Sequence, residues 1–107
     1  MIDIDEERVG KAMRYPAETD LPYAEAKAAL ESSEILRKRV RARVFLTEDG
    51  TVAERQAEAE THHDTEAADD QYVHAIKAFE ELKARRQRAE LLIDVWRSLE
   101  ATRRKAA

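Results

Sequence analysis

The placement of glycine and proline is the feature that most limits how this chain can fold. The sequence has 107 residues but only two glycines and two prolines, and all four lie within the first 50 positions. From residue 51 onward no residue forces a helix to end, and strong helix formers such as alanine, leucine and glutamate dominate. A β-sandwich would need many more turn residues than this chain contains. We therefore predict an all-α fold in one small domain.

The first half of the sequence divides into a polar arm and a helix. We expect residues 1–20 to form an acidic N-terminal arm and residues 21–107 to form a helical domain. The sequence of the arm is also compatible with a short helix over residues 6–14. Asp20 is a suitable N-cap and Pro22 suits a first helical turn, so we expect a helix from there to about Leu46. Two nearly opposite stripes of small and apolar residues indicate that neighbours pack on both faces of this helix. The stripes are Ala26, Ala29, Ser33, Leu36, Val40 and Val44, and then Ala24, Ala28, Ile35, Ala42 and Leu46.

A turn at residues 48–51 separates this helix from the second half of the chain. Asp49-Gly50 favours positive φ, and Thr51 followed by Glu54 is a capping-box pattern that predicts the start of a new helix. Beyond it we expect either one very long helix or two helices that meet near residue 63. In the second case Asp64 or Thr65 would cap the later helix.

The C-terminal helix also carries two apolar stripes. One follows helical spacing from Tyr72 through Phe79 to Trp96, with Arg86 as an interruption, and the other lies on a different side near the end of the chain. A shorter first helix cannot cover both, so we expect an elongated helical hairpin with a long C-terminal helix that forms homo-oligomers. The expected subunit interface consists of Leu91, Leu92, Val95, Trp96 and Leu99.

Basic residues gather in two clusters although the net charge of the chain is −4. The first comprises Arg37, Lys38, Arg39, Arg41 and Arg43, and the second comprises Lys83, Arg85, Arg86 and Arg88. Such clusters can neutralise phosphates without reading the base sequence. The alternative is that they form salt bridges within or between subunits, with acids such as Glu54, Glu58, Glu60 and Asp64. Across the hairpin turn, we expect residues near 40 to lie opposite residues near 60, so the two basic clusters would be separated.

Several classes of site find no support in the sequence. The chain has no cysteine, no glycine-rich phosphate loop and no serine in a nucleophile-elbow context, so we expect neither an enzyme nor a cofactor. His62 and His63 stand near acids at helical spacing, but we interpret them as marking a helix junction and predict no metal site. No apolar run is long enough for a transmembrane helix, and the N-terminus does not resemble a signal peptide. We expect a cytoplasmic protein without membrane contact.

Five segments of the chain resemble the phage recombination mediators of the UvsY type, from about Leu21 to Arg104. These are Leu21-Pro22-Tyr23-Ala24, the basic segment Lys38-Arg39-Val40-Arg41-Ala42-Arg43, Tyr72 after an acidic stretch, Phe79-x-x-Leu82-Lys83, and Val95-Trp96-Arg97-Ser98-Leu99-Glu100. Members of that family are small helical proteins that form rings and bind single-stranded DNA. The resemblance implies that Lys38, Arg39, Arg41 and Arg43 contact DNA.

The resemblance also implies what the protein does. It implies a mediator that helps load a RecA-like recombinase onto single-stranded DNA, with the recombinase and a single-strand-binding protein as partners, in the bacterial host cytoplasm if the chain is phage-encoded. The competing hypothesis is a helical coiled-coil interaction or assembly protein that does not bind nucleic acid. In that case the same charges would form salt bridges.

Overall fold

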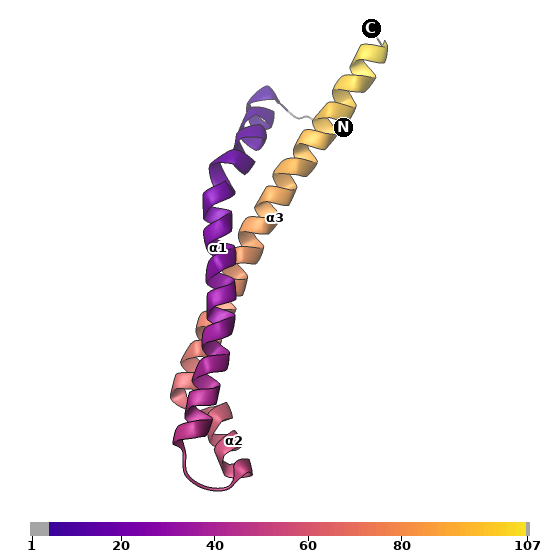
Figure 1. Cartoon of the computed structure of the whole chain (residues 1–107). Helices are drawn as coiled ribbons and strands as arrows, with labels where there is room; N and C mark the ends of the chain where they lie inside the picture. The colour runs from indigo at the N-terminus through magenta and orange to yellow at the C-terminus, as the bar shows by residue number, and fades with distance from the viewer. Residues whose placement is uncertain (1–4, 107) are drawn as a thin grey trace. The chain divides into compact units, whose positions relative to one another are not determined.

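The computed structural model describes residues 5–106, and these residues form three α-helices and no strand (Figure 1). The helices are α1 (Glu6–Thr47), α2 (Val52–Thr61) and α3 (His63–Ala106). The predicted all-α fold with a long C-terminal helix is therefore confirmed. The chain divides into two compact units. Unit 1 combines residues 1–24 with residues 80–107, and unit 2 consists of residues 25–79.

Helix α1 begins earlier than the sequence predicted. Asp5 accepts a hydrogen bond from the backbone N–H of Arg8 at 2.7 Å, and its carbonyl accepts the first helical bond from Val9. Asp5 is thus the N-terminal cap, and the predicted helix start at Asp20 is wrong. Pro16 and Pro22 both lie inside α1, although each removes a backbone donor that an uninterrupted helix would use. The segment between the two prolines is instead held by Arg86 of α3, described below.

The connection between α1 and α2 has the chemistry that was predicted for it. Gly50 adopts a φ of 115°, which residues with a Cβ rarely adopt. Thr51 is the N-cap of α2, and its hydroxyl accepts the backbone N–H of Glu54 at 3.2 Å. The turn and the helix start after it are therefore confirmed.

A single residue, His62, separates α2 from α3. Its backbone N–H donates to the carbonyl of Glu58, which ends α2, and its own carbonyl accepts from Glu66, which begins α3. Its Nδ1 accepts the backbone N–H of Asp64 at 3.0 Å. Of the two alternatives, the structure has two helices that meet near residue 63, but the capping side chain is that of His62 and not that of Asp64 or Thr65.

Unit 2 contains the larger of the two buried cores. Val40, Val44, Ala59 and Ala68 are buried together, and Leu36 and Phe45 pack against them. These contacts bury the C-terminal part of the first stripe on α1, whereas Ala29 of that stripe is exposed. The second stripe is not covered within the unit, because Ile35 is 50% exposed and Leu46 is 72% exposed. The expectation of neighbours on both faces is therefore not met within unit 2.

Unit 1 pairs the beginning of α1 with the end of α3. Val9 and Ala12 are buried there, and Arg86 joins the two helices. Of the residues that were predicted to form a subunit interface, Leu91 (63%) and Leu99 (39%) are exposed. Leu92, Val95 and Trp96 are half-buried. Exposed leucines of this kind leave apolar surface available for a partner.

Candidate nucleic-acid interface

The basic segment at residues 37–43 contains two sets of side chains with different roles. Arg37 Nε lies 3.1 Å from Asp69 Oδ1, and its guanidinium lies 4.6 Å from the centre of the Tyr72 ring. Arg41 bridges two helices, with Nη2 at 3.4 Å from Asp69 Oδ2 and Nε at 3.4 Å from Glu60 Oε1. Both arginines are half-buried. These two side chains therefore hold α1 against α2 and α3.

The acid that holds both arginines is not among the four acids that the sequence suggested. Of those four, Glu60 pairs with Arg41, whereas Asp69 accepts from both arginines. Residues near 40 thus lie opposite residue 69 as well as residue 60. The reason is that α3 begins after His62 and brings Asp69 beside Arg37 and Arg41, while α2 brings Glu60 beside Arg41.

The other basic side chains of this segment point to solvent. Lys38, Arg39 and Arg43 are all exposed. Lys38 has only a helix-surface partner, Glu34 Oε1 at 3.6 Å. Arg39 and Arg43 form no ion pair with any residue in the range 5–106. Because residues four apart share one face of a helix, Arg39 and Arg43 form an outward ridge on the flank opposite Arg37 and Arg41. We call Lys38, Arg39 and Arg43 together the outward basic ridge, although Lys38 lies on the other side of the exposed face, beside Arg41.

The second basic cluster, in unit 1, is divided in the same way. Arg86 donates to the Pro16 carbonyl at 3.0 Å, to Thr19 Oγ1 at 2.9 Å and to Asp20 Oδ1 at 2.9 Å. Its guanidinium also lies 4.7 Å from the centre of the Tyr23 ring. Lys83 is half-buried, whereas Arg85 and Arg88 are exposed. The structure thus explains why Arg86 interrupts the apolar stripe of α3.

Aromatic rings, which could stack on bases, are mostly engaged by the protein itself. Tyr72 and Tyr23 lie under Arg37 and Arg86, and Phe45 lies 5.2 Å from the Arg55 guanidinium. Tyr15 is different, because it lines a groove in unit 1 beside Arg85 and Arg88. Tyr15 lies within residues 1–20, which were expected to form the acidic arm. The helical spacing of Arg8, Lys11 and Tyr15 was the signal that could have identified this wall of the groove.

The histidines are accounted for by the helix junction. One ligand atom of His62 lies within 4.8 Å of carboxylate oxygens of Glu48 and Glu58, and a similar grouping joins His62, His63 and Asp64. Since His62 Nδ1 already accepts a backbone N–H, a capping role explains this residue without a ligand. The rings of His62 and His63 stack at 4.2 Å.

Comparison with known protein families, with curated proteins and with solved structures finds no match for this chain. Within the described residues, no helix is both long enough and apolar enough to cross a bilayer.

Proposed function

We propose that this chain is a single-stranded-DNA-binding recombination mediator that acts without catalysing a reaction and helps load a RecA-like recombinase. The observation that carries the proposal is the outward basic ridge. Lys38, Arg39 and Arg43 project from one stretch of α1, are exposed, and have no cross-helix carboxylate partner among the described residues. A ridge of this kind fits a phosphate backbone and releases counterions when it binds.

The same arrangement limits the set of residues that contact DNA. Arg37, Arg41 and Arg86 are held by carboxylates and aromatic rings of the chain. Using them for phosphates would break contacts that join the helices, so we leave them out of the proposed set. Lys83 is half-buried, and Arg85 and Arg88 border the groove of unit 1. The proposed contact set is therefore Lys38, Arg39 and Arg43.

Repetition would give this small set useful affinity. Three cations on one subunit bind a strand weakly, but a homo-oligomer would present one ridge per subunit along the same strand, which raises avidity. Exposed apolar side chains such as Ile35 and Leu46 supply surface for such self-association.

The direct test is titration of a fluorescein-labelled oligothymidylate, followed by anisotropy at several salt concentrations. We expect binding that does not depend on base sequence, with a slope of log K against log salt of about −0.7 per phosphate contact. The double variant Arg39→Gln/Arg43→Gln should weaken binding and flatten this slope by about 1.4 per subunit. Arg85→Gln/Arg88→Gln, which removes the same charge elsewhere, is the matched control and should bind normally. Absence of binding by the unaltered protein at about 50 mM salt would refute the proposal.

The mediator step needs its own assay. Single-stranded DNA is coated with a single-strand-binding protein, and DNA-dependent ATP hydrolysis by a RecA-like recombinase is measured with and without this chain. We expect a shorter lag before hydrolysis begins, and no such effect from Arg39→Gln/Arg43→Gln. An unchanged lag in the presence of normal DNA binding would restrict the protein to a DNA-binding role.

A helical assembly protein without nucleic-acid binding is the second candidate. It is favoured by the ion pairs of Arg37 and Arg41, which use part of the basic segment to join helices. It predicts a stable oligomer by light scattering and no salt-sensitive oligonucleotide binding. Those two results together would favour it over the mediator.

A further inference from the structure

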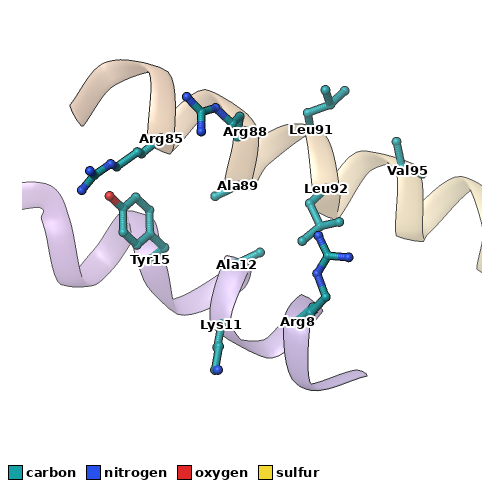
Figure 2. A pocket seen from close by; sticks show the side chains of 10 residues that line it. All are labelled: Arg8, Lys11, Ala12, Tyr15, Arg85, Arg88, Ala89, Leu91, Leu92 and Val95. Carbon is teal, nitrogen blue, oxygen red and sulfur yellow. The ribbon is translucent and has the colours of Figure 1, made fainter. Parts of the chain in front are cut away.

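The groove of unit 1 has an aliphatic lining. It lies between the first turns of α1 and the second half of α3 and encloses a volume of about 630 Å³. Ala12 and Ala89 lie on the two facing helices and Leu92 points toward α1, whereas Leu91 and Val95 line the groove from the side of α3 that is turned away from α1 in Figure 2. Leu91 is 63% exposed. A volume of this size accommodates several side chains of a ligand.

Four cations surround this aliphatic lining. Arg8 and Lys11 lie on α1, and Arg85 and Arg88 lie on α3. The two members of each pair are three positions apart in the sequence. No carboxylate belongs to the lining. Lys11 has a helix-surface partner in Glu7, at 3.6 Å, with both side chains exposed. The side chains of Arg8, Arg85 and Arg88 form no ion pair with the described residues. Four positive charges at one groove are notable in a chain whose net charge is −4.

We infer that this groove binds an acidic amphipathic helix of a partner protein. Aliphatic side chains on one face of such a helix would enter the groove, as in other helix-in-groove complexes. Carboxylates beside them would meet Arg8 and Lys11 on one wall and Arg85 and Arg88 on the other. This charge complementarity selects acidic partners and speeds their association.

The lining decides between a peptide and a nucleic acid. Single-stranded DNA binds proteins by phosphate contacts together with stacking of successive bases on aromatic rings. The groove offers one ring, Tyr15, which extends toward Arg85 (Figure 2), against five alanine, leucine and valine side chains. A surface rich in aliphatic groups suits aliphatic side chains better than bases. The inference uses none of the residues of the outward basic ridge, so it does not depend on the proposed function.

Arg86 acts as a positioning residue for this groove. It binds Thr19 and Asp20 of α1 from α3, just beyond Tyr15 and Arg85. It thereby sets the separation of the two walls at that end, although it does not line the groove itself.

The test uses a fluorescein-labelled peptide of about 18 residues, long enough to be helical, with leucines on one face and glutamates flanking them. A second peptide with lysine in place of each glutamate keeps the apolar face and reverses the charge. The full-length protein should bind the acidic peptide and not the basic one, as followed by anisotropy at about 50 mM salt. Arg85→Gln/Arg88→Gln should weaken binding of the acidic peptide about tenfold.

Matched controls separate this site from the DNA site. Arg39→Gln/Arg43→Gln should bind the acidic peptide normally and lose oligothymidylate, whereas Arg85→Gln/Arg88→Gln should do the reverse. If Arg85→Gln/Arg88→Gln instead loses oligothymidylate, the groove is a nucleic-acid site and the inference is wrong. If that variant lowers the mass of the protein in solution, a second copy of the chain occupies the groove and the inference is also wrong. Equal binding of both peptides, or of neither, would overturn it as well.

Discussion

Arg86 offers the sharpest test of how unit 1 is held together. Its side chain is only 18% exposed and makes three hydrogen bonds to the segment between Pro16 and Asp20, together with its contact to the Tyr23 ring. The substitution Arg86→Ala removes all four interactions at once. Because these interactions tie α3 to the proline-containing segment of α1, we expect α1 to loosen around its two prolines.

The size of the effect follows from the geometry. The bonds to the Pro16 carbonyl and to Thr19 Oγ1 are partly buried and contribute about 1 kcal/mol each. The contact with the ring of Tyr23 adds about 1 kcal/mol. Asp20 is 69% exposed, so its ion pair adds less than about 0.5 kcal/mol. Arg86→Ala should therefore lower the free energy of unfolding by about 3 kcal/mol, which corresponds to a fall in Tm of roughly 15 °C.

Two measurements at fixed protein concentration check this prediction. Urea unfolding gives the change in free energy, and Arg85→Ala, at an exposed neighbouring position, is the control that should change it by less than about 0.5 kcal/mol. Hydrogen exchange locates the change. The amides of residues 6–24 should lose protection in Arg86→Ala, whereas those of Val40 and Val44 in unit 2 should keep it. The reasoning would be refuted if the two variants unfolded alike, or if protection fell equally in both units.

Three further predictions concern unit 2. His62→Ala removes the cap of α3 and should lower the free energy of unfolding by about 1 kcal/mol. His62→Asn, which can also cap, and His63→Ala should change it little. Equal losses of stability in all three variants would contradict the capping role. Thr65 is fully buried and its hydroxyl has no hydrogen-bond partner among the described residues. Thr65→Val should therefore raise the free energy of unfolding by about 1 kcal/mol, as measured by thermal unfolding. A loss of stability would show that the hydroxyl is hydrogen-bonded. Gly50→Ala should lower the free energy of unfolding in urea by about 1–2 kcal/mol, because φ is positive and the new Cβ would lie 2.6 Å from Glu54 Oε2. Asp49→Ala is the control, and an equal loss of stability in both variants would contradict the role given to the positive φ of Gly50.

Local chemistry made the turn at Gly50 predictable. Positive φ at Gly50 and the hydroxyl of Thr51 act within a few residues of sequence, so no distant contact is needed to specify them. The cap at His62 was not predictable in the same way. Imidazole is not among the preferred N-caps, and Asp64 and Thr65 were chemically better candidates.

The start of α1 could not be predicted because tertiary contacts override propensity there. Pro16 and Pro22 argue locally against a continuous helix. Arg86 holds the segment between the two prolines from a position 70 residues away from Pro16. No residue near either proline in the sequence predicts that contact.

The basic segment shows what helical periodicity can and cannot predict. Val40 and Val44 define the buried stripe, and periodicity then places Arg37 and Arg41 on one of its flanks and Arg39 and Arg43 on the other. Which flank meets carboxylates depends on where Asp69 comes to lie, and that position depends on the break at His62. The residue types of the candidate site could therefore be predicted, but their division into paired and outward side chains could not.

The different sequence separations of these contacts have a consequence for folding during synthesis. Arg37 and Arg41 reach Asp69 across 32 and 28 residues, whereas Arg86 reaches back across 66 to 70 residues to α1. Unit 2 can therefore fold while the ribosome is still adding α3, and its closure brings the remaining partners nearer to each other. Residues 16–24 are made early but must wait several seconds for Arg86 at about 5–20 residues per second. During that interval this proline-containing segment, like the rest of α1 that belongs to unit 1, is open to chaperones and proteases.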